Sequence, residues 1–160
     1  MVRAELEGLA AEMFARYASD EEVAKLVAAF GQVELAARTE NLDVIHDVMH
    51  AKDRLYGILF QGAGNPILTQ MVGILQRRVT QFRALTLAQP GRPVRSVEEI
   101  TVVVDAIRRR DAESARAAAT LHVHEAARTV LGAIGHVSAV SLHAQPVGAG
   151  PGDGGGARPV

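Results

Sequence analysis

The chain has 160 residues, about the size of one domain, and its 17 Lys and Arg residues nearly balance 18 Asp and Glu residues. The resulting net charge of −1 gives no reason to expect a nucleic acid or an anionic membrane as a partner. The absence of cysteine excludes a disulfide framework, a thiolate nucleophile and cysteine-ligated zinc. No apolar run reaches the ~18 residues of a spanning helix, and the amphipathic start does not resemble a signal peptide, so we expect a cytoplasmic protein.

Helical periodicity covers most of the chain and predicts an all-α protein, an antiparallel bundle of about six helices. The first predicted helix spans about residues 2–17, and its expected inward stripe is Leu6, Leu9, Met13 and Tyr17. Ser19 and Glu22 have the spacing of a capping box and predict the start of a second helix, about residues 20–38.

The third and fourth predicted helices each carry a cation on an apolar stripe. In the third, about residues 42–61, the stripe is Leu42, Ile45, Met49, Lys52, Tyr56 and Leu59. Asn65 and Pro66 have the residue types of an N-cap and a first turn, and they predict a fourth helix to about Leu87. Its stripe is Leu68, Met71, Leu75, Arg78, Phe82 and Leu85. We therefore expect the side chains of Lys52 and Arg78 to point inward.

The remaining chain divides into two further helices and a tail. Residues 89–93 are expected to form a loop, and Ser96 and Glu99 have capping-box spacing, which predicts a fifth helix from there to about Arg109. Asp111 is the expected cap of a sixth helix to about Ile134, with residues 135–143 as a frayed extension. The end of the chain is rich in Gly and Pro and favours disorder. We expect one helical domain, residues 1–140, and a disordered tail, residues 141–160.

Three stretches together resemble a known family: VRAELEGLAAEMFARYASDEEV (2–23), GAGNPIL (62–68) and SVEEITVVVDAIRRRDAESARAAATLHV (96–123). Their order and spacing are similar to the FCD domain, the effector-binding and dimerisation domain of FadR-type transcription regulators in the GntR family. The resemblance implies a homodimer and, in full-length relatives, a winged helix that binds DNA. Because Met1 lies almost where such a domain begins, we expect no winged helix here. Loss of that segment, a truncated or misassigned start, and independent function all remain open.

Many members of this family hold a divalent metal through an Asp-x-x-x-His pair and two later histidines, and the metal holds a carboxylate effector. Matching this pattern onto the chain places Lys52, Tyr56, Ile100 and His122 at the four ligand positions. A shift by one residue places Asp53 and Gly57 at the first two positions and does not rebuild the site. The resemblance therefore implies a variant without the metal, and we expect no cofactor.

The candidate effector-binding residues are Lys52, Tyr56, Arg78 and His122, and the expected effector is a small carboxylate. Arg78 would bind it by two parallel hydrogen bonds, Lys52 would supply charge, and Tyr56 and His122 would supply hydrogen bonds. His124 points about 200° away from His122 on a helix, so the two cannot share one ion. In the alternative, Lys52 and Arg78 extend to the rim and only cover apolar surface, or pair with carboxylates such as Glu99 and Asp105.

Other patterns carry weaker hypotheses. Asp43, His46, Asp47 and His50 form D-x-x-H-D-x-x-H on a face that we expect to be exposed, and a metal site at His46 and His50 is a minor alternative. No nucleophile lies beside a base, so we expect no enzyme activity. The main hypothesis is a sensor in which a small organic acid shifts dimer geometry. The alternatives are a stand-alone dimerisation module without a small ligand and a metal-dependent sensor.

Overall fold

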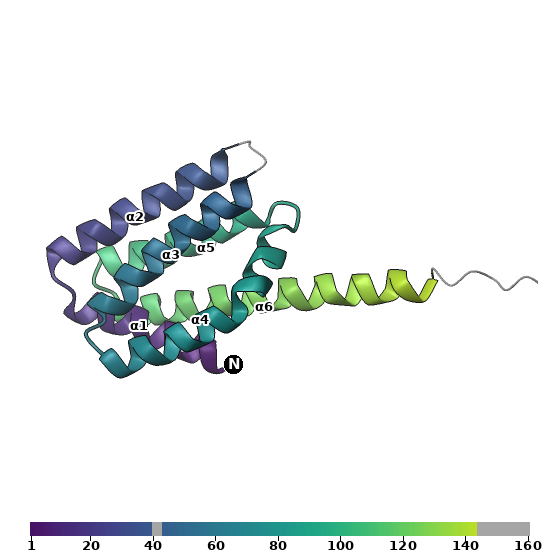
Figure 1. The fold of residues 1–160 in the computed structure, drawn as a ribbon. Helices are drawn as coiled ribbons and strands as arrows, with labels where there is room; N and C mark the ends of the chain where they lie inside the picture. Colours follow the sequence, from purple (N-terminus) through teal and green to yellow (C-terminus); the bar gives the residue numbers. More distant parts are fainter. Residues whose placement is uncertain (40–42, 144–160) are drawn as a thin grey trace, which may run out of the picture.

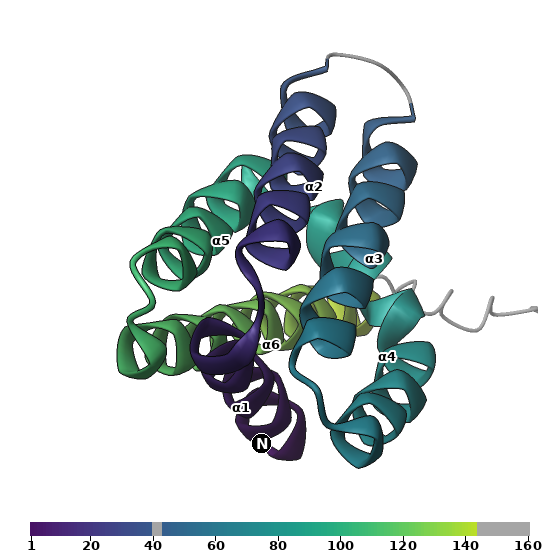
Figure 2. The same ribbon diagram turned by 90° about the vertical axis from the view of Figure 1, so that its left-hand side faces the viewer.

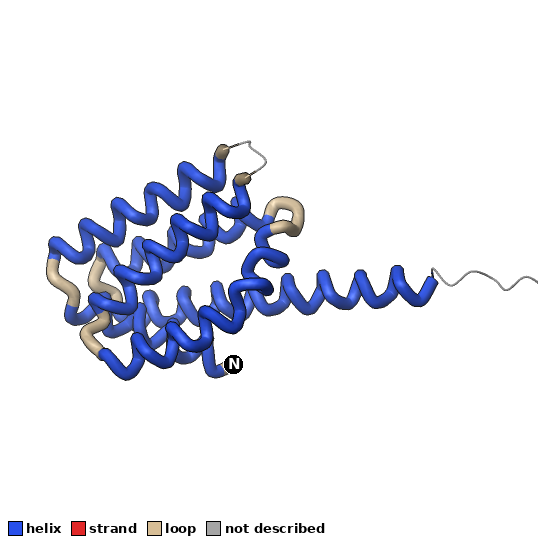
Figure 3. Tube along the Cα trace, viewed as in Figure 1, coloured by secondary structure: helices blue, strands red, loops and turns tan. Residues whose placement is uncertain are grey.

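The computed structural model describes the backbone of residues 1–39 and 43–143, and side chains in these ranges except at 79, 81 and 134–143. Its helices are α1 (Val2–Tyr17), α2 (Asp20–Arg38), α3 (Val44–Gly62), α4 (Pro66–Leu87), α5 (Arg92–Arg108) and α6 (Ala112–His143). No strand occurs in the described ranges (Figure 3), and the all-α prediction is confirmed. Residues 141–143 continue α6, and the rest of the predicted tail lies outside the described residues. None of the described helices is long and apolar enough to cross a membrane.

Three of the predicted helix starts have the expected side-chain caps. The Glu22 N–H donates to Ser19 Oγ at 3.2 Å, and the Ser19 N–H donates to Glu22 Oε2 at 2.7 Å, which completes the capping box of α2. Asn65 Oδ1 accepts from the Leu68 N–H at 3.1 Å at the start of α4. Asp111 Oδ1 accepts from the Ser114 N–H at 3.0 Å at the start of α6.

The predicted start of the fifth helix is wrong. Helix α5 begins at Arg92, after Gly91, which has a φ of 70°, and Pro93 lies in its first turn. Ser96 and Glu99 therefore lie within the helix rather than at its N-cap. Both side chains bind partners on other elements or earlier in α5, which their spacing in the sequence does not reveal.

The helices pack as a bundle around one core. Figure 2 shows α2 between α3 and α5, and α2 makes its main contacts with α3, while α6 packs against α5 and α4. Helix α1 packs chiefly against α6. The two approach closely at Gly8, where an added Cβ would lie 2.3 Å from Thr120 Oγ1. The second half of α6 extends past the other helices (Figure 1).

The buried face of α1 is built from small residues rather than from the predicted stripe. Its buried apolar residues are Ala4, Ala10, Ala11, Phe14 and Ala15. Leu6, Leu9 and Met13 are only partly buried, and Tyr17 is 69% exposed. The predicted stripe therefore lies beside the true core face, because alanine permits the close contact with α6 that larger side chains would prevent.

Helix α4 carries apolar side chains on two faces, and this makes the predicted orientation of Arg78 wrong. The inward face holds Leu68, Val72, Thr86 and Leu87, together with the largely buried Arg83. Arg78 is exposed. It lies among exposed apolar residues that we call the α4 apolar face: Ile67, Met71, Ile74, Phe82 and Leu85. The predicted stripe took Leu68 from the inward face and Met71, Phe82 and Leu85 from the exposed face. Residues of the two faces are neighbours in the sequence, so a shift of one position exchanges the faces.

Candidate functional site

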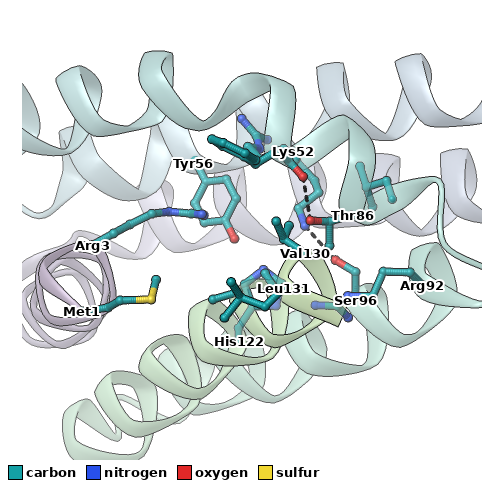
Figure 4. Close-up of a pocket in the computed structure, with 15 residues that line it drawn as sticks. Met1, Arg3, Lys52, Tyr56, Thr86, Arg92, Ser96, His122, Val130 and Leu131 are labelled. Carbon is teal, nitrogen blue, oxygen red and sulfur yellow. Dashed lines mark hydrogen bonds between the residues drawn. The ribbon is translucent and has the colours of Figure 1, made fainter. Parts of the chain in front are cut away.

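A cavity of about 410 Å³ lies between α3, α4, α5, α6 and the start of α1 (Figure 4). This volume is in the range of pockets that bind small molecules. Its polar lining comes from Arg3, Lys52, Tyr56, Arg83, Thr86, Arg92, Ser96 and His122. Its apolar lining comes from Met1, Phe82, Leu87, Ala126, Ala127, Val130 and Leu131. Three of the four predicted effector-binding residues, Lys52, Tyr56 and His122, meet at this cavity, and Arg78 does not.

Three guanidinium groups line the cavity, and each has a carboxylate partner. Their nearest N–O distances are 2.6 Å for Arg3 and Glu7, 2.6 Å for Arg83 and Asp53, and 2.7 Å for Arg92 and Glu99. Arg92 is only 2% exposed and binds Glu99 through both terminal nitrogens. A buried arginine requires such a partner, because removal of an unpaired charge from water is costly.

Lys52 is the exception among the cations of the cavity. Its Nζ donates to Ser96 Oγ at 2.7 Å (Figure 4), and no carboxylate of the described residues lies within ion-pair distance of it. The side chain is 6% exposed, so the prediction that it points inward is confirmed. Burial, and then repulsion from Arg83, Arg92 and Arg3, lowers the pKa of Lys52 to about 7. The cavity therefore holds a buried amine whose charged form lacks an anion.

His122 and Glu99 form a second polar contact, between α6 and α5. His122 Nδ1 lies 2.5 Å from Glu99 Oε2. Burial opposes ionisation of Glu99, but hydrogen bonds from His122 and Arg92 outweigh it and hold the pKa of this carboxyl at about 2. Burial, and then the charge of Lys52, lowers the pKa of His122 to about 4 despite the bond to Glu99. At pH 7 the imidazole is neutral, and because Glu99 only accepts, Nδ1 carries the proton. Nε2 is then an acceptor at the cavity.

Tyr56 contributes a hydroxyl to the cavity and an aromatic ring to its wall. Burial raises the pKa of Tyr56 far above its usual value, so the hydroxyl stays protonated and able to donate. The ring stacks on Phe60 with centroids 5.7 Å apart, and the Arg83 guanidinium carbon lies 6.0 Å from the Tyr56 centroid. Figure 4 shows the hydroxyl directed into the cavity.

Two guanidinium donors at the cavity are buried without a partner in the part of the chain that the structure describes. They are Arg83 Nη2 and Arg92 Nε. Buried donors are nearly always paired in folded proteins, so each marks a position where a ligand or water oxygen is expected. Sequence reasoning missed Arg83 and Arg92 as cavity residues. Arg83 could have been found from its position in the sequence. It lies four residues before Leu87 and eleven after Val72, and these spacings place all three residues on the same face of a helix.

The polar pair His46 and His50 lies outside the cavity. Both residues are exposed, and their Nε2 atoms are 3.0 Å apart, the distance of a direct hydrogen bond. Among the side chains that the structure describes, no group of three or more potential metal ligands occurs. To bind one metal ion together, the two imidazoles would have to give up this hydrogen bond. A metal site at His46 and His50 stays a hypothesis.

The fold and the cavity together define a class: an all-α helical bundle with a cavity between its helices. The model of one family, the FCD domain, matches residues 1–125. The chain belongs to this family, the effector-binding domains of GntR-type transcription regulators, as its sequence motifs predicted. No curated protein matches the chain.

The metal of related domains does not fit this cavity. The matched positions do converge, since Lys52, Tyr56 and His122 line the main cavity, while Tyr56, Ile100 and His122 line a smaller adjoining one. However, an ammonium and an aliphatic chain occupy two of the four positions, and the ammonium would repel a cation. Zinc requires three or four N, S or O ligands, so no step of the proposed mechanism involves a metal.

Proposed function

We propose that this domain senses a small carboxylate that binds in the cavity and shifts the packing of the helices, in the cytoplasm and without catalysis. The observation that carries the proposal is the buried Lys52 ammonium, which has a neutral hydroxyl as its hydrogen-bond partner and three arginines nearby. A ligand carboxylate would complete this cluster by supplying the missing negative charge.

The donors around the cavity suggest how the carboxylate is held. Lys52 Nζ would form the ion pair, and the unpartnered Arg83 Nη2 would donate a second hydrogen bond. Arg83 thus replaces Arg78 in the role expected from the sequence. The Tyr56 hydroxyl would donate a further bond. These groups come from α3 and α4, so a bound anion would draw the two helices together.

We assign the α4 apolar face to contact with a second copy of the chain. FCD domains of GntR regulators dimerise, and this face exposes Ile67, Met71 and Ile74 in a helical stripe. Ligand binding would act on the dimer through α4, because Arg83 faces the cavity and Phe82 belongs both to the cavity lining and to the α4 apolar face. Replacement of Met71 by Asp should shift the protein toward monomer in sedimentation velocity, and an unchanged dimer would place the interface elsewhere.

A thermal-shift screen tests the sensing proposal. Butanoate, hexanoate, benzoate and succinate are each added to the wild-type protein, Lys52→Met, Arg83→Met and the control Arg78→Met. A ligand at about 100 times its dissociation constant stabilises by about 3 kcal/mol, a rise of several degrees for a protein of this size. Wild type and Arg78→Met should respond equally, and the other two variants should lose the response. A full response of folded Lys52→Met contradicts the proposed site.

The same screen separates the alternative functions. The α4 apolar face favours a stand-alone dimerisation module as the second candidate. A dimer that responds to no carboxylate supports that module. Arms with zinc or nickel test the metal-dependent sensor, for which a response should disappear in His46→Ala.

A further inference from the structure

We infer that the ligand is a monocarboxylate with an apolar tail, rather than a dicarboxylate or a hydroxylated sugar acid. This inference rests on the proposed function and specifies the chemical class that the cavity accepts. Two independent features carry it: the balance of charges at the polar end of the cavity, and the residues that follow His122 along α6.

The charge balance favours a single negative charge. The three arginines of the cavity each have one carboxylate partner, in Glu7, Asp53 and Glu99. His122 is hydrogen-bonded to Glu99 and neutral at pH 7. Lys52 alone, among the described charged groups of the lining, lacks a carboxylate partner. One ligand carboxylate neutralises this site, whereas a second one would have no cation left to pair with.

The lining of the cavity becomes apolar along α6. Starting from His122, the helix contributes Ala126, Ala127, Val130 and Leu131. Val130 lies eight positions after His122, which corresponds to about 12 Å at the rise of an α-helix. Across from them, Phe82 and Leu87 of α4 and Met1 continue the apolar surface. A ligand whose carboxylate binds Lys52 can therefore extend an apolar tail beside α6.

This lining also disfavours polar ligands of the same size. The α6 residues that line the cavity beyond His122 offer aliphatic side chains, and their backbone groups are used within the helix. A second carboxylate or a row of hydroxyls placed there would find no side-chain hydrogen-bond partner on α6, so a polar tail would gain less from this surface than an apolar one. Selectivity between ligands thus comes from the apolar residues beside the tail, while the polar end of the cavity fixes the position of the carboxylate.

The test is isothermal titration calorimetry with two matched series. The monocarboxylates are butanoate, hexanoate and octanoate, and the dicarboxylates of the same lengths are succinate, adipate and suberate. Each buried methylene should tighten binding about fourfold. We expect affinity to rise along the first series, and each dicarboxylate to bind at least tenfold more weakly than its monocarboxylate counterpart.

Two variants locate the tail. Ala127→Leu should fill the apolar end and weaken octanoate at least tenfold, while butanoate stays within twofold. Leu131→Asp, at an exposed position that tolerates charge, should weaken octanoate in the same selective way. The control is Ala117→Leu, an exposed alanine on α6 that does not line the cavity and should leave both ligands unaffected.

The outcomes distinguish this inference from the proposed function. Tighter binding of adipate than of hexanoate, or equal loss of butanoate and octanoate in Ala127→Leu, overturns the inference and leaves a carboxylate sensor in place. Failure of every acid to bind the folded wild-type protein overturns the proposed function, and the inference falls with it.

Discussion

Lys52 Nζ on α3 donates a 2.7 Å hydrogen bond to Ser96 Oγ on α5, a contact between a cation and a neutral hydroxyl. A single neutral acceptor does not replace the water that an ammonium loses on burial. The free domain therefore bears a cost at this position, and a bound anion would reduce it. The first two predictions follow from this relationship.

The first prediction concerns stability as a function of pH. The pKa of Lys52 falls from 10.5 in the unfolded chain to about 7 in the folded protein. Between these values the unfolded state binds more protons, so stability rises with pH. From pH 7 to pH 9.5, chemical denaturation should report a gain on the order of 2 to 3 kcal/mol.

Lys52→Met supplies the control for this pH dependence. The variant should lack the rise and should be more stable than the wild type at pH 7, because it buries no charge. Above about pH 10 the raised pKa of Tyr56 acts in the opposite direction, so the comparison ends below that pH. An identical rise in both proteins would show that another group is responsible.

The second prediction concerns protons taken up with the ligand. At pH 8 an amine with a pKa of about 7 is mostly neutral, and an adjacent carboxylate raises its pKa. Hexanoate binding at pH 8 should take up nearly one proton, and at pH 6 far less. Calorimetry in phosphate and in Tris measures the uptake, because the two buffers differ in ionisation enthalpy. Equal binding heats in both buffers at pH 8 would contradict proton-coupled binding.

The third prediction concerns the partner of the most buried arginine. Glu99→Gln removes the charge that Arg92 binds through two hydrogen bonds. Since Arg92 is almost fully buried and Glu99 is partly exposed, we expect a loss of about 3 kcal/mol in the free energy of unfolding. The matched control is Glu98→Gln, at an exposed position, which should change stability by less than about 0.5 kcal/mol. Similar small effects of both variants would mean that Arg92 finds another partner.

The fourth prediction concerns the contact between α1 and α6. In Gly8→Ala the new methyl group would lie 2.3 Å from Thr120 Oγ1 and 3.2 Å from the Arg116 carbonyl oxygen, so the helices must separate. We expect a loss of about 1 to 3 kcal/mol in thermal or chemical denaturation. Gly31→Ala is the control, because nothing lies within 4 Å of its added Cβ and alanine favours a helix. Gly31→Ala should be neutral or slightly stabilising, and a stable Gly8→Ala protein would contradict the close packing.

Much of the fold follows from local sequence signals. The caps at Ser19, Asn65 and Asp111 depend on side chains that bind the backbone three residues away, so their spacing suffices to predict them. The inward faces are harder to predict. In α1 the core face is mostly alanine, and in α4 apolar residues cover two faces, so hydrophobic periodicity alone selected a face displaced by about one residue.

The cavity was only half predictable for a related reason. Lys52, Tyr56 and His122 were found because they lie at positions that match the family pattern. Ser96 and Glu99 looked like a capping box, since their long-range partners Lys52 and His122 are 44 and 23 residues away. Arg92 was assigned to a loop. Contacts over such distances depend on how the helices pack, and a single sequence contains no direct record of them.

Phe82 belongs both to the cavity lining and to the α4 apolar face, and this limits how the ligand preference of the domain can evolve. Its side chain is part of the cavity lining and is also 48% exposed on α4. If ligand and second subunit meet at this ring, a substitution there alters ligand preference and assembly at once. The domain could then not adapt to a new chemical signal at this residue without also retuning its own oligomerisation.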